Sequence, residues 1–489
     1  MNPFPPNETR QALSSGLPGN DDAASIPTRA VAFTSLPPSH ARALDPDAIL
    51  VEGIRGAGKS FWWSALHSDK HRAFIATAFP EASAVARLRT SQGFGTGLDP
   101  AVAPSKDVLA HLAAKHDPRS IWRAVVATHL EFSSPFPTIN WDQRVSWVAQ
   151  NPEMYDHLLY NKDLELASRG QTHIVLFDAL DRLADDWPGI RPLARALLQL
   201  ALDLRSLRMV RLKLFVRPDM LEDPGISSFP DASKLLSRKA SLAWRRADLY
   251  ALLYQCLGNA PQGGEAFRSH CDSAFGLKWK LNAESDAWVV PNALRLDEEK
   301  QKDVFHAITG PTMGSGPSGH KRGYPYTWLP NHLLDGREQV SPRSFAAALR
   351  YAAAADIPED WQYALSYRGI QAGVQEASRI RVDEIREDYP WVDDVMKPLH
   401  GKLTVPCSEE EMVSTWKPDD TIGSLREQVS GSPTVKLPPQ HIDDGPRGIL
   451  RDLAALGVVM LMSDGRIQMP DVYRVAFGLG RRGGVRPLK

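Results

Sequence analysis

The chain has 489 residues, 43% of them hydrophobic, and its 57 Lys and Arg residues nearly balance its 58 Asp and Glu residues. This length allows about two to four domains, and the balanced charge excludes a general electrostatic attraction to nucleic acid or anionic lipid. Three cysteines without a C-x-x-C pair exclude a disulfide framework and a structural zinc site, and no apolar run or N-terminal signal pattern indicates a membrane span or secretion. Composition therefore predicts a cytoplasmic protein with no membrane partner.

The first half of the chain has the pattern of an α/β domain. Residues 1–30 are rich in Pro, Asn, Ser, Gly and Asp, which predicts a flexible leader. Residues 31–225 then alternate apolar runs with helical patterns, as expected where helices flank a parallel sheet. We predict strands at 48–52, 72–78, 172–177 and 211–216, with a mostly helical elaboration of the core over 95–170.

The most specific motif follows the first of these strands. It reads Gly53-x-x-x-x-Gly58-Lys59-Ser60, the Walker A pattern of P-loop NTPases, and an apolar helical stripe comes after it. The glycines let backbone N–H groups face a β-phosphate, Lys59 brings positive charge to the β- and γ-phosphates, and the Ser60 hydroxyl suits Mg²⁺. No Asn/Thr-Lys-x-Asp motif follows, which favours ATP over GTP. We predict a site for ATP and Mg²⁺ formed by Gly53, Ile54, Arg55, Gly56, Ala57, Gly58, Lys59 and Ser60.

A second strand ends in a carboxylate. Residues 173–177 are an apolar run that leads directly into Asp178, which predicts a second Mg²⁺ ligand at the carboxyl end of a buried strand. Asp181 is a candidate to orient the attacking water, or else a helix N-cap. Ala179 stands where AAA+ ATPases usually carry a glutamate, so hydrolysis is slow, depends on Asp181, or is absent.

Two arginines are candidates to contact the γ-phosphate. Arg217 ends the predicted strand 211–216 and is either a phosphate sensor or an exposed arginine at a strand end. Arg343 follows Pro342 in the first turn of an alanine-rich helix, within the helical block 226–360. We interpret this block as a lid over the nucleotide, with Arg343 reaching into the site. Its Gly-rich stretch 310–319 lacks a preceding strand and a following Lys-Ser/Thr, which favours a flexible insertion over a second phosphate cradle.

The last third of the chain combines helices with a hairpin. Residues 361–475 predict a helical region and a winged-helix-like module, in which Ser408 and Glu411 form a capping box. A helical stripe over 446–457 precedes two short apolar runs that flank Ser-Asp-Gly at 463–465, a strong turn signal. Residues 476–489 form a basic tail.

The order of these motifs resembles the AAA+ and STAND groups of P-loop NTPases. Residues 177–183 and 215–219 are similar to the signature of bacterial KAP-like and STAND-like ATPases, and the resemblance covers mainly 45–255. It implies a three-layer αβα core, a helical lid and a winged-helix module. Such proteins act as switches through a protein partner or a homo-oligomer, often in bacterial antiphage defence.

Three functions are compatible with these patterns. The first is an ATP-operated switch that controls a partner or effector protein. The second is a DNA-binding AAA+ ATPase resembling replication initiators, and the third is a nucleotide-binding scaffold without turnover. DNA is the less favoured partner, because Arg451 is the one cation of the segment 448–457, whose apolar stripe suits packing better than groove reading. Cations available for DNA are those of the basic tail and Lys234, Arg238, Lys239, Arg245 and Arg246.

Overall fold

The computed structural model describes residues 2–19, 31–431 and 435–481. The chain divides into two compact units. The sheet unit is Pro38–Leu242, and the helical unit joins the described residues before Pro38 to those from Ala243 onward.

The sheet unit is built on five parallel strands in the order β2-β3-β4-β1-β5. Their register places Val51 of β1 beside both Phe215 of β4 and Ala240 of β5. Because these side chains are buried, the central strands read as apolar runs. The strands are β1 Leu50–Glu52, β2 Leu88–Phe94, β3 Thr172–Phe177, β4 Val210–Val216 and β5 Ala240–Ser241.

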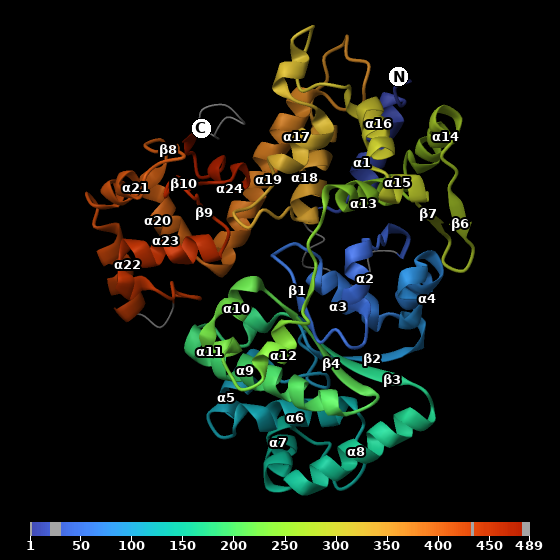
Figure 1. Cartoon of the computed structure of the whole chain (residues 1–489). Helices are drawn as coiled ribbons and strands as arrows, with labels where there is room; N and C mark the ends of the chain where they lie inside the picture. Colours follow the sequence, from blue (N-terminus) through green and yellow to red (C-terminus); the bar gives the residue numbers. More distant parts are fainter. Residues whose placement is uncertain (1, 20–30, 432–434, 482–489) are drawn as a thin grey trace. The chain divides into compact units, whose positions relative to one another are not determined.

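Helices cover both faces of this sheet. α3 (Lys59–His67) and α4 (Asp69–Ala78) lie on one face, and α6 (Pro118–His129) and α9 (Trp187–Asp203) on the other (Figure 1). Trp122 of α6 packs edge-on against Phe94 and Phe177, with ring centroids 6.0 and 5.7 Å away. The predicted three-layer α/β fold is therefore confirmed. The remaining helices are α2 Ala41–Leu44, α5 Lys106–Ala113, α7 Trp141–Gln150, α8 Pro152–Ser168, α10 Pro218–Glu222, α11 Pro224–Ser227 and α12 Ala232–Leu236.

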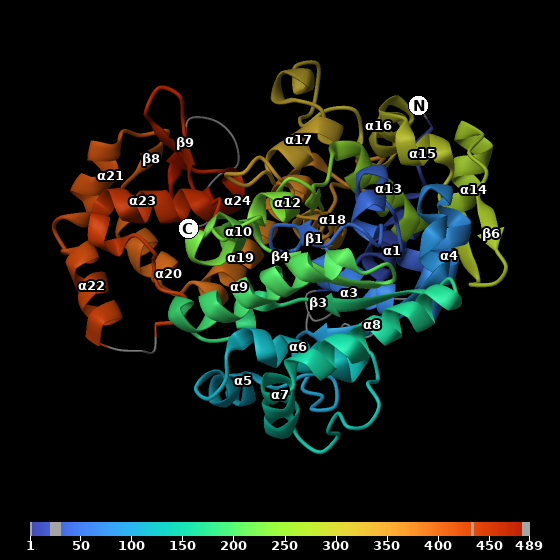
Figure 2. The ribbon, with the colours of Figure 1, turned by 60° about the horizontal axis from the view of Figure 1, so that its bottom comes forward.

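Two expectations for this unit are wrong. Residues 72–78 are not a strand but part of α4, whose N-cap Ser68 accepts a hydrogen bond from the backbone N–H of His71. The core does not end at 225, because β5 pairs with β1 and the sheet unit therefore continues to Leu242. The helical elaboration over 95–170 is present as α5 to α8, which lie together in both views (Figure 1, Figure 2).

Two buried charged side chains anchor β4. The Asp163 carboxylate of α8 accepts hydrogen bonds from the backbone N–H groups of Arg208, Met209 and Val210 at 2.9, 2.7 and 3.0 Å. The Lys213 ammonium donates to the carbonyls of Ala43, Asp45 and Ala48 at 2.7, 2.8 and 2.6 Å. Since a buried charge is tolerated only when it is hydrogen-bonded, these contacts fix the strand relative to α8 and to the chain before β1.

The first part of the helical unit includes the N-terminus. α1 (Pro6–Gly16) contacts α13, α14 and α18, and Phe4 stacks on Phe267 with ring centroids 5.0 Å apart. The expected flexible leader is thus wrong for 6–16, since Leu13 and Phe4 are buried; residues 20–30 lie outside the described residues. The other elements are α13 Arg246–Gly258, α14 Gly264–Phe275, β6 Lys280–Asn282, β7 Ala287–Val289, α15 Asn292–Leu296, α16 Glu298–Thr309, α17 Pro325–Asn331, α18 Pro342–Ala354 and α19 Tyr367–Asp388.

The C-terminal part has the predicted helices and hairpin. Ser408 and Glu411 form the capping box, and β9 pairs antiparallel with β10 across the turn at 463–465. Most of the basic tail lies outside the described residues, while Gly480 and Arg481 pair with Thr404 and Val405. Among the described residues, no helix has the length and hydropathy needed to cross a membrane. The elements are α20 Trp391–Met396, β8 Thr404–Val405, α21 Glu409–Trp416, α22 Thr421–Gly431, α23 Pro446–Ala455, β9 Met460–Leu461, β10 Ile467–Gln468, α24 Asp471–Arg474 and β11 Gly480–Arg481.

Candidate functional site

The loop between β1 and α3 has the backbone of a phosphate cradle. The Gly53 N–H donates to the Val216 carbonyl at 3.1 Å, which ties the start of the loop to β4. A Cβ on Gly53 would lie 3.1 Å from the Cβ of Ala57 and 3.2 Å from that of Leu242, so only glycine fits without displacement. Gly58 has a φ of +99°, a conformation that favours glycine. The loop therefore needs its glycines for close packing and for the left-handed turn that opens α3.

Lys59 is held by the loop itself. Its ammonium donates to the carbonyls of Gly53 and Ile54 at 2.7 and 2.9 Å. Burial lowers the pKa of Lys59 to about 8. Nearby carboxylates act in the opposite direction and raise this pKa, with the largest such effect from Asp178. The ammonium is thus desolvated and would gain from an anion placed in the loop.

Ser60 and Asp178 bring two oxygen ligands together. Asp178 follows β3, its N–H donates to the Phe94 carbonyl at 3.0 Å, and its carboxylate accepts a hydrogen bond from the Ser60 hydroxyl. Burial raises the pKa of Asp178, while this hydrogen bond and the Lys59 charge lower it. A hydroxyl beside a buried carboxylate fits Mg²⁺, which binds oxygen and takes its other ligands from phosphate and water. Within the described residues, no group of three or more His, Cys, Asp or Glu could hold a metal ion.

The chain turns sharply after Asp178. Ala179 has a φ of +57° and is the N-cap of a short 3₁₀ helix, Leu180–Arg182. Asp181 lies inside that helix, so the interpretation of Asp181 as an N-cap is wrong. Its side chain is 19% exposed and forms an ion pair with Arg217, with Oδ2 and Nη1 3.2 Å apart. Its role in catalysis stays a prediction.

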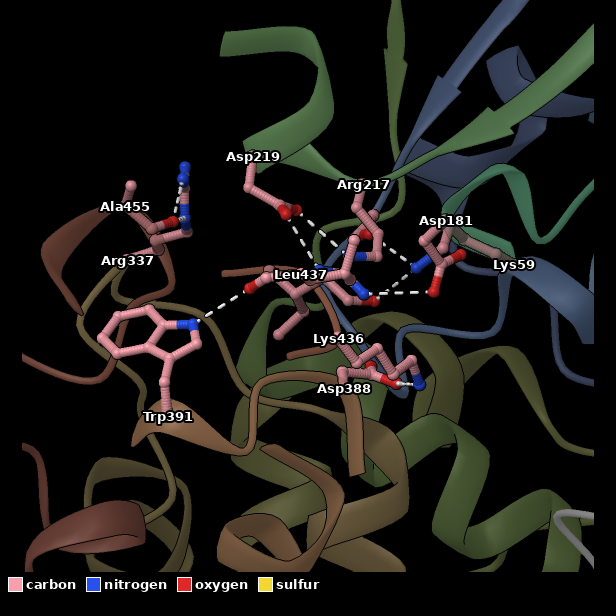
Figure 3. A network of polar contacts seen from close by, with 12 residues as sticks. Lys59, Asp181, Arg217, Asp219, Arg337, Asp388, Trp391, Lys436, Leu437 and Ala455 are labelled. Atoms are coloured by element: carbon pink, nitrogen blue, oxygen red, sulfur yellow. Dashed lines mark hydrogen bonds and ion pairs between the residues drawn. The ribbon is translucent and has the colours of Figure 1, made fainter. Parts of the chain in front are cut away.

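Arg217 lies between two carboxylates (Figure 3). Its Nε and Nη2 donate to Asp219 at 3.1 and 2.8 Å, and its Nη1 donates to Asp181. The side chain is 9% exposed, so the alternative of an exposed arginine at a strand end is wrong. Asp219 was not among the predicted residues. The sequence feature that could have indicated Asp219 is Arg-Pro-Asp directly after a strand. Pro218 begins α10, and the first turn of this helix brings the Asp219 carboxylate back beside Arg217.

Arg343 belongs to the helical unit. It lies in the first turn of α18, and its Nη1 is 2.5 Å from the Glu384 carboxylate of α19. Ser341 is the N-cap residue, but its side chain forms no capping hydrogen bond with the described residues. A role for Arg343 at the nucleotide stays a prediction.

The sheet order and the site share one edge. Five site residues follow the carboxyl ends of β1, β3 and β4, which are adjacent parallel strands. They are Lys59, Asp178, Asp181, Arg217 and Asp219. Ligands of open α/β sheets bind at this edge. The fold and the loop together define a P-loop nucleotide-binding domain.

Comparison with known proteins gives no closer assignment. No protein-family model matches the chain, and no curated protein matches its sequence. The ORC2 protein of Aeropyrum pernix, solved in ADPNP–ADP complexes, is 13% identical, with a TM-score of 0.37 over 90% of this chain and 93% of that chain. A Walker-type ATPase of Pyrococcus abyssi is 14% identical, with a TM-score of 0.35 over 90% of this chain and 97% of that chain. At these identities and scores the similarity carries no argument about function.

The pKa of Lys59 makes nucleotide binding dependent on pH. A phosphate bound beside Lys59 is expected to raise this pKa above its value of about 8, so we expect binding to take up a proton near and above pH 8. The affinity for MgATP is expected to be constant up to about pH 7.5 and then to fall by up to about tenfold per pH unit, since free protein has lost the proton that the complex needs. Calorimetric titration in two buffers of different ionisation enthalpy measures this uptake. Lys59→Arg, which stays charged, is the control; an equal fall in both proteins contradicts the assignment.

Proposed function

We propose that the chain is an ATP-binding and ATP-hydrolysing molecular switch of the AAA+/STAND type that controls a partner protein or assembly. The observation that carries this proposal is the hydrogen bond between Ser60 and Asp178 beside the buried Lys59. A cation, a hydroxyl and a carboxylate at the carboxyl edge of a parallel sheet are the groups that bind a nucleoside triphosphate with Mg²⁺.

Each residue then has a defined part. The N–H groups of 53–60 bind the β-phosphate, and Lys59 exchanges the carbonyls of Gly53 and Ile54 for phosphate oxygens. Ser60 and Asp178 would hold Mg²⁺, which would neutralise charge on the phosphates. Asp181 orients the attacking water and accepts its proton, and Arg217 stabilises charge on the γ-phosphate. The helical residues from Ala243 to 360 supply the lid, with Arg343 as a further phosphate contact.

The DNA-binding alternative has less support from the structure. Outside the basic tail, four of the five candidate cations form ion pairs with carboxylates at 2.7–3.1 Å: Lys234 with Asp231, Lys239 with Glu52, Arg245 with Asp248 and Arg246 with Glu298. In α23, Ile449 and Leu453 are fully buried, which agrees with a packing role for this helix. We therefore favour a protein partner or effector, with a homo-oligomer as the form in which the switch acts. Its place in cytoplasmic antiphage defence is proposed from the sequence resemblance alone.

Phosphate release from the purified chain tests turnover. We expect MgATP hydrolysis above background for the native chain and a lower rate for Lys59→Ala, because the loop loses its cation. Equal rates for both proteins would contradict the proposal that the chain hydrolyses ATP. In that case, an increase in the melting temperature of the native chain on adding ATP would support the alternative of a nucleotide-binding scaffold. The mass of the assembly with and without ATP tests the oligomer.

A further inference from the structure

The glycine-rich loop of the helical unit presents three consecutive basic residues. Residues 310–324 join α16 to α17. Within them, the Met313 N–H closes the base of the loop 310–323 by donating to the Gly323 carbonyl at 2.9 Å. A second hydrogen bond, from the Gly319 N–H to the Gly316 carbonyl at 3.0 Å, turns the tip. The exposed side chains of His320, Lys321 and Arg322 follow in a short 3₁₀ helix, Gly319–Arg322. We call the exposed residues His320, Lys321 and Arg322 the basic edge of this loop.

Three aromatic rings lie against this loop. The Leu365 N–H donates to the Ile308 carbonyl at 3.0 Å, which fixes the segment before α19 beside the end of α16. The ring centroid of Trp361 is 5.7 Å from that of Tyr363 and 5.9 Å from that of Tyr367. A Cβ on Gly310 would lie 3.1 Å from the Tyr363 ring and 3.4 Å from the Trp361 ring, so glycine lets these rings approach the loop. All three rings are half-buried.

One of the three rings, that of Tyr367, is hydrogen-bonded to the loop. The Tyr367 hydroxyl bonds to the side chains of Ser315 and Arg368, and the Arg368 guanidinium lies 5.8 Å from the centre of the Tyr367 ring. Arg322 is close enough to lower the pKa of the Tyr367 hydroxyl, after the effect of these hydrogen bonds. We name the surface formed by 310–323, Trp361, Tyr363, Tyr367 and Arg368 the aromatic–basic patch.

The cations of the patch are not neutralised. In the described part of the chain, Lys321, Arg322 and Arg368 form no ion pair with a carboxylate, unlike the paired cations near β5 and α13. Three acidic residues, Asp356, Glu359 and Asp360, precede Trp361 in the sequence. Free cations beside half-exposed rings fit a ligand that carries both phosphates and flat bases.

We propose that the aromatic–basic patch binds single-stranded nucleic acid. Unpaired bases stack on the rings of Trp361, Tyr363 and Tyr367, and the phosphates between them contact Lys321, Arg322 and Arg368. A duplex is the poorer ligand, since its bases are already stacked and their faces are closed to the rings. This binding is separate from the P-loop and needs no nucleotide.

Fluorescence anisotropy of a labelled 30-nucleotide oligo-dT with the full chain tests the proposal. We expect binding at 50 mM salt that weakens steeply toward 200 mM, in proportion to the phosphates contacted. Trp361→Ala is expected to weaken binding about tenfold, as for the loss of one stacked base. Lys321→Glu with Arg322→Glu is expected to weaken it at least as much and to flatten the salt dependence, without touching the buried core.

Matched variants separate the patch from general effects. The exposed Lys300 and Lys402 lie outside the patch, and changing both to Glu gives the same change of net charge with an expected loss below threefold. Trp361→Phe retains a stacking ring and is expected to restore most of the affinity, and Lys59→Ala is expected to bind as the native chain does. The proposal is overturned by absence of oligo-dT binding at 50 mM salt, by equal losses in the two double variants, or by tighter binding of the corresponding duplex.

Discussion

Asp178→Asn is expected to lower the turnover number for MgATP about 1,000-fold. The substitution keeps the size of the side chain but removes its charge, at a position 3% exposed and hydrogen-bonded to Ser60. The variant lacks the proposed Mg²⁺ ligand and the negative charge beside Lys59 in a buried site. A 1,000-fold loss corresponds to about 4 kcal/mol of transition-state stabilisation. Phosphate release at saturating MgATP measures the effect.

Asp185→Asn is the matched control for this prediction. Asp185 is in the same loop region after β3, but its side chain is 66% exposed and pairs with Lys106 on the surface. A surface ion pair of this kind contributes little, so we expect less than a twofold change. Turnover by Asp178→Asn equal to that of the control would show that Asp178 does not act in hydrolysis.

Asp181→Asn is expected to lower turnover about 100-fold and to change the affinity for MgATP less than threefold. Asp181 is the partly exposed carboxylate of the site, and its loss removes the proposed proton acceptor. Arg217 keeps its two hydrogen bonds to Asp219, so the arginine stays in place. Single-turnover hydrolysis and equilibrium binding of a fluorescent ATP analogue separate the two effects.

Asp219→Asn gives the comparison needed to interpret that result. Asp219 positions the Arg217 guanidinium by two parallel contacts, and an amide replaces one of its acceptors with a donor. We expect about a tenfold loss of turnover, with the pH profile of the native protein retained. If instead Asp181→Asn keeps full turnover while Asp219→Asn does not, Asp181 is only an ion-pair partner of Arg217.

The predictable part of the molecule is the part encoded locally. β1, β3 and β4 are buried on both faces and read as apolar runs, and the P-loop has fixed spacing within eight residues. β2 was missed because it lies at the sheet edge and contains the half-buried polar residues 89–92. The strand predicted at 72–78 is wrong, since Phe74 and Ile75 suit a strand as well as a helix. The N-cap residue Ser68 is the sequence signal that indicates the helix.

Contacts between distant segments account for the rest of the site. Nothing near Arg217 in the sequence indicates its ion pair with Asp181, which lies 36 residues earlier. The same holds for Arg343 and Glu384, 41 residues apart. The position of α1 depends on burial of Phe4 and Leu13 against α13 and α14, and its polar composition suggests a free leader. Such pairings need the fold before they can be assigned.

The strand that carries the P-loop has a late partner. In the described sheet, β1 pairs only with β4 and β5. The Lys213 ammonium donates a hydrogen bond to the carbonyl of Ala48, just before β1, although the two residues are 165 positions apart in the sequence. During synthesis, β1 therefore has to wait until residues 210–241 leave the ribosome. At about 5–20 residues per second, this delay is roughly 10 to 40 s. A nascent chain stopped before residue 210 would have the complete Walker A sequence and no nucleotide site.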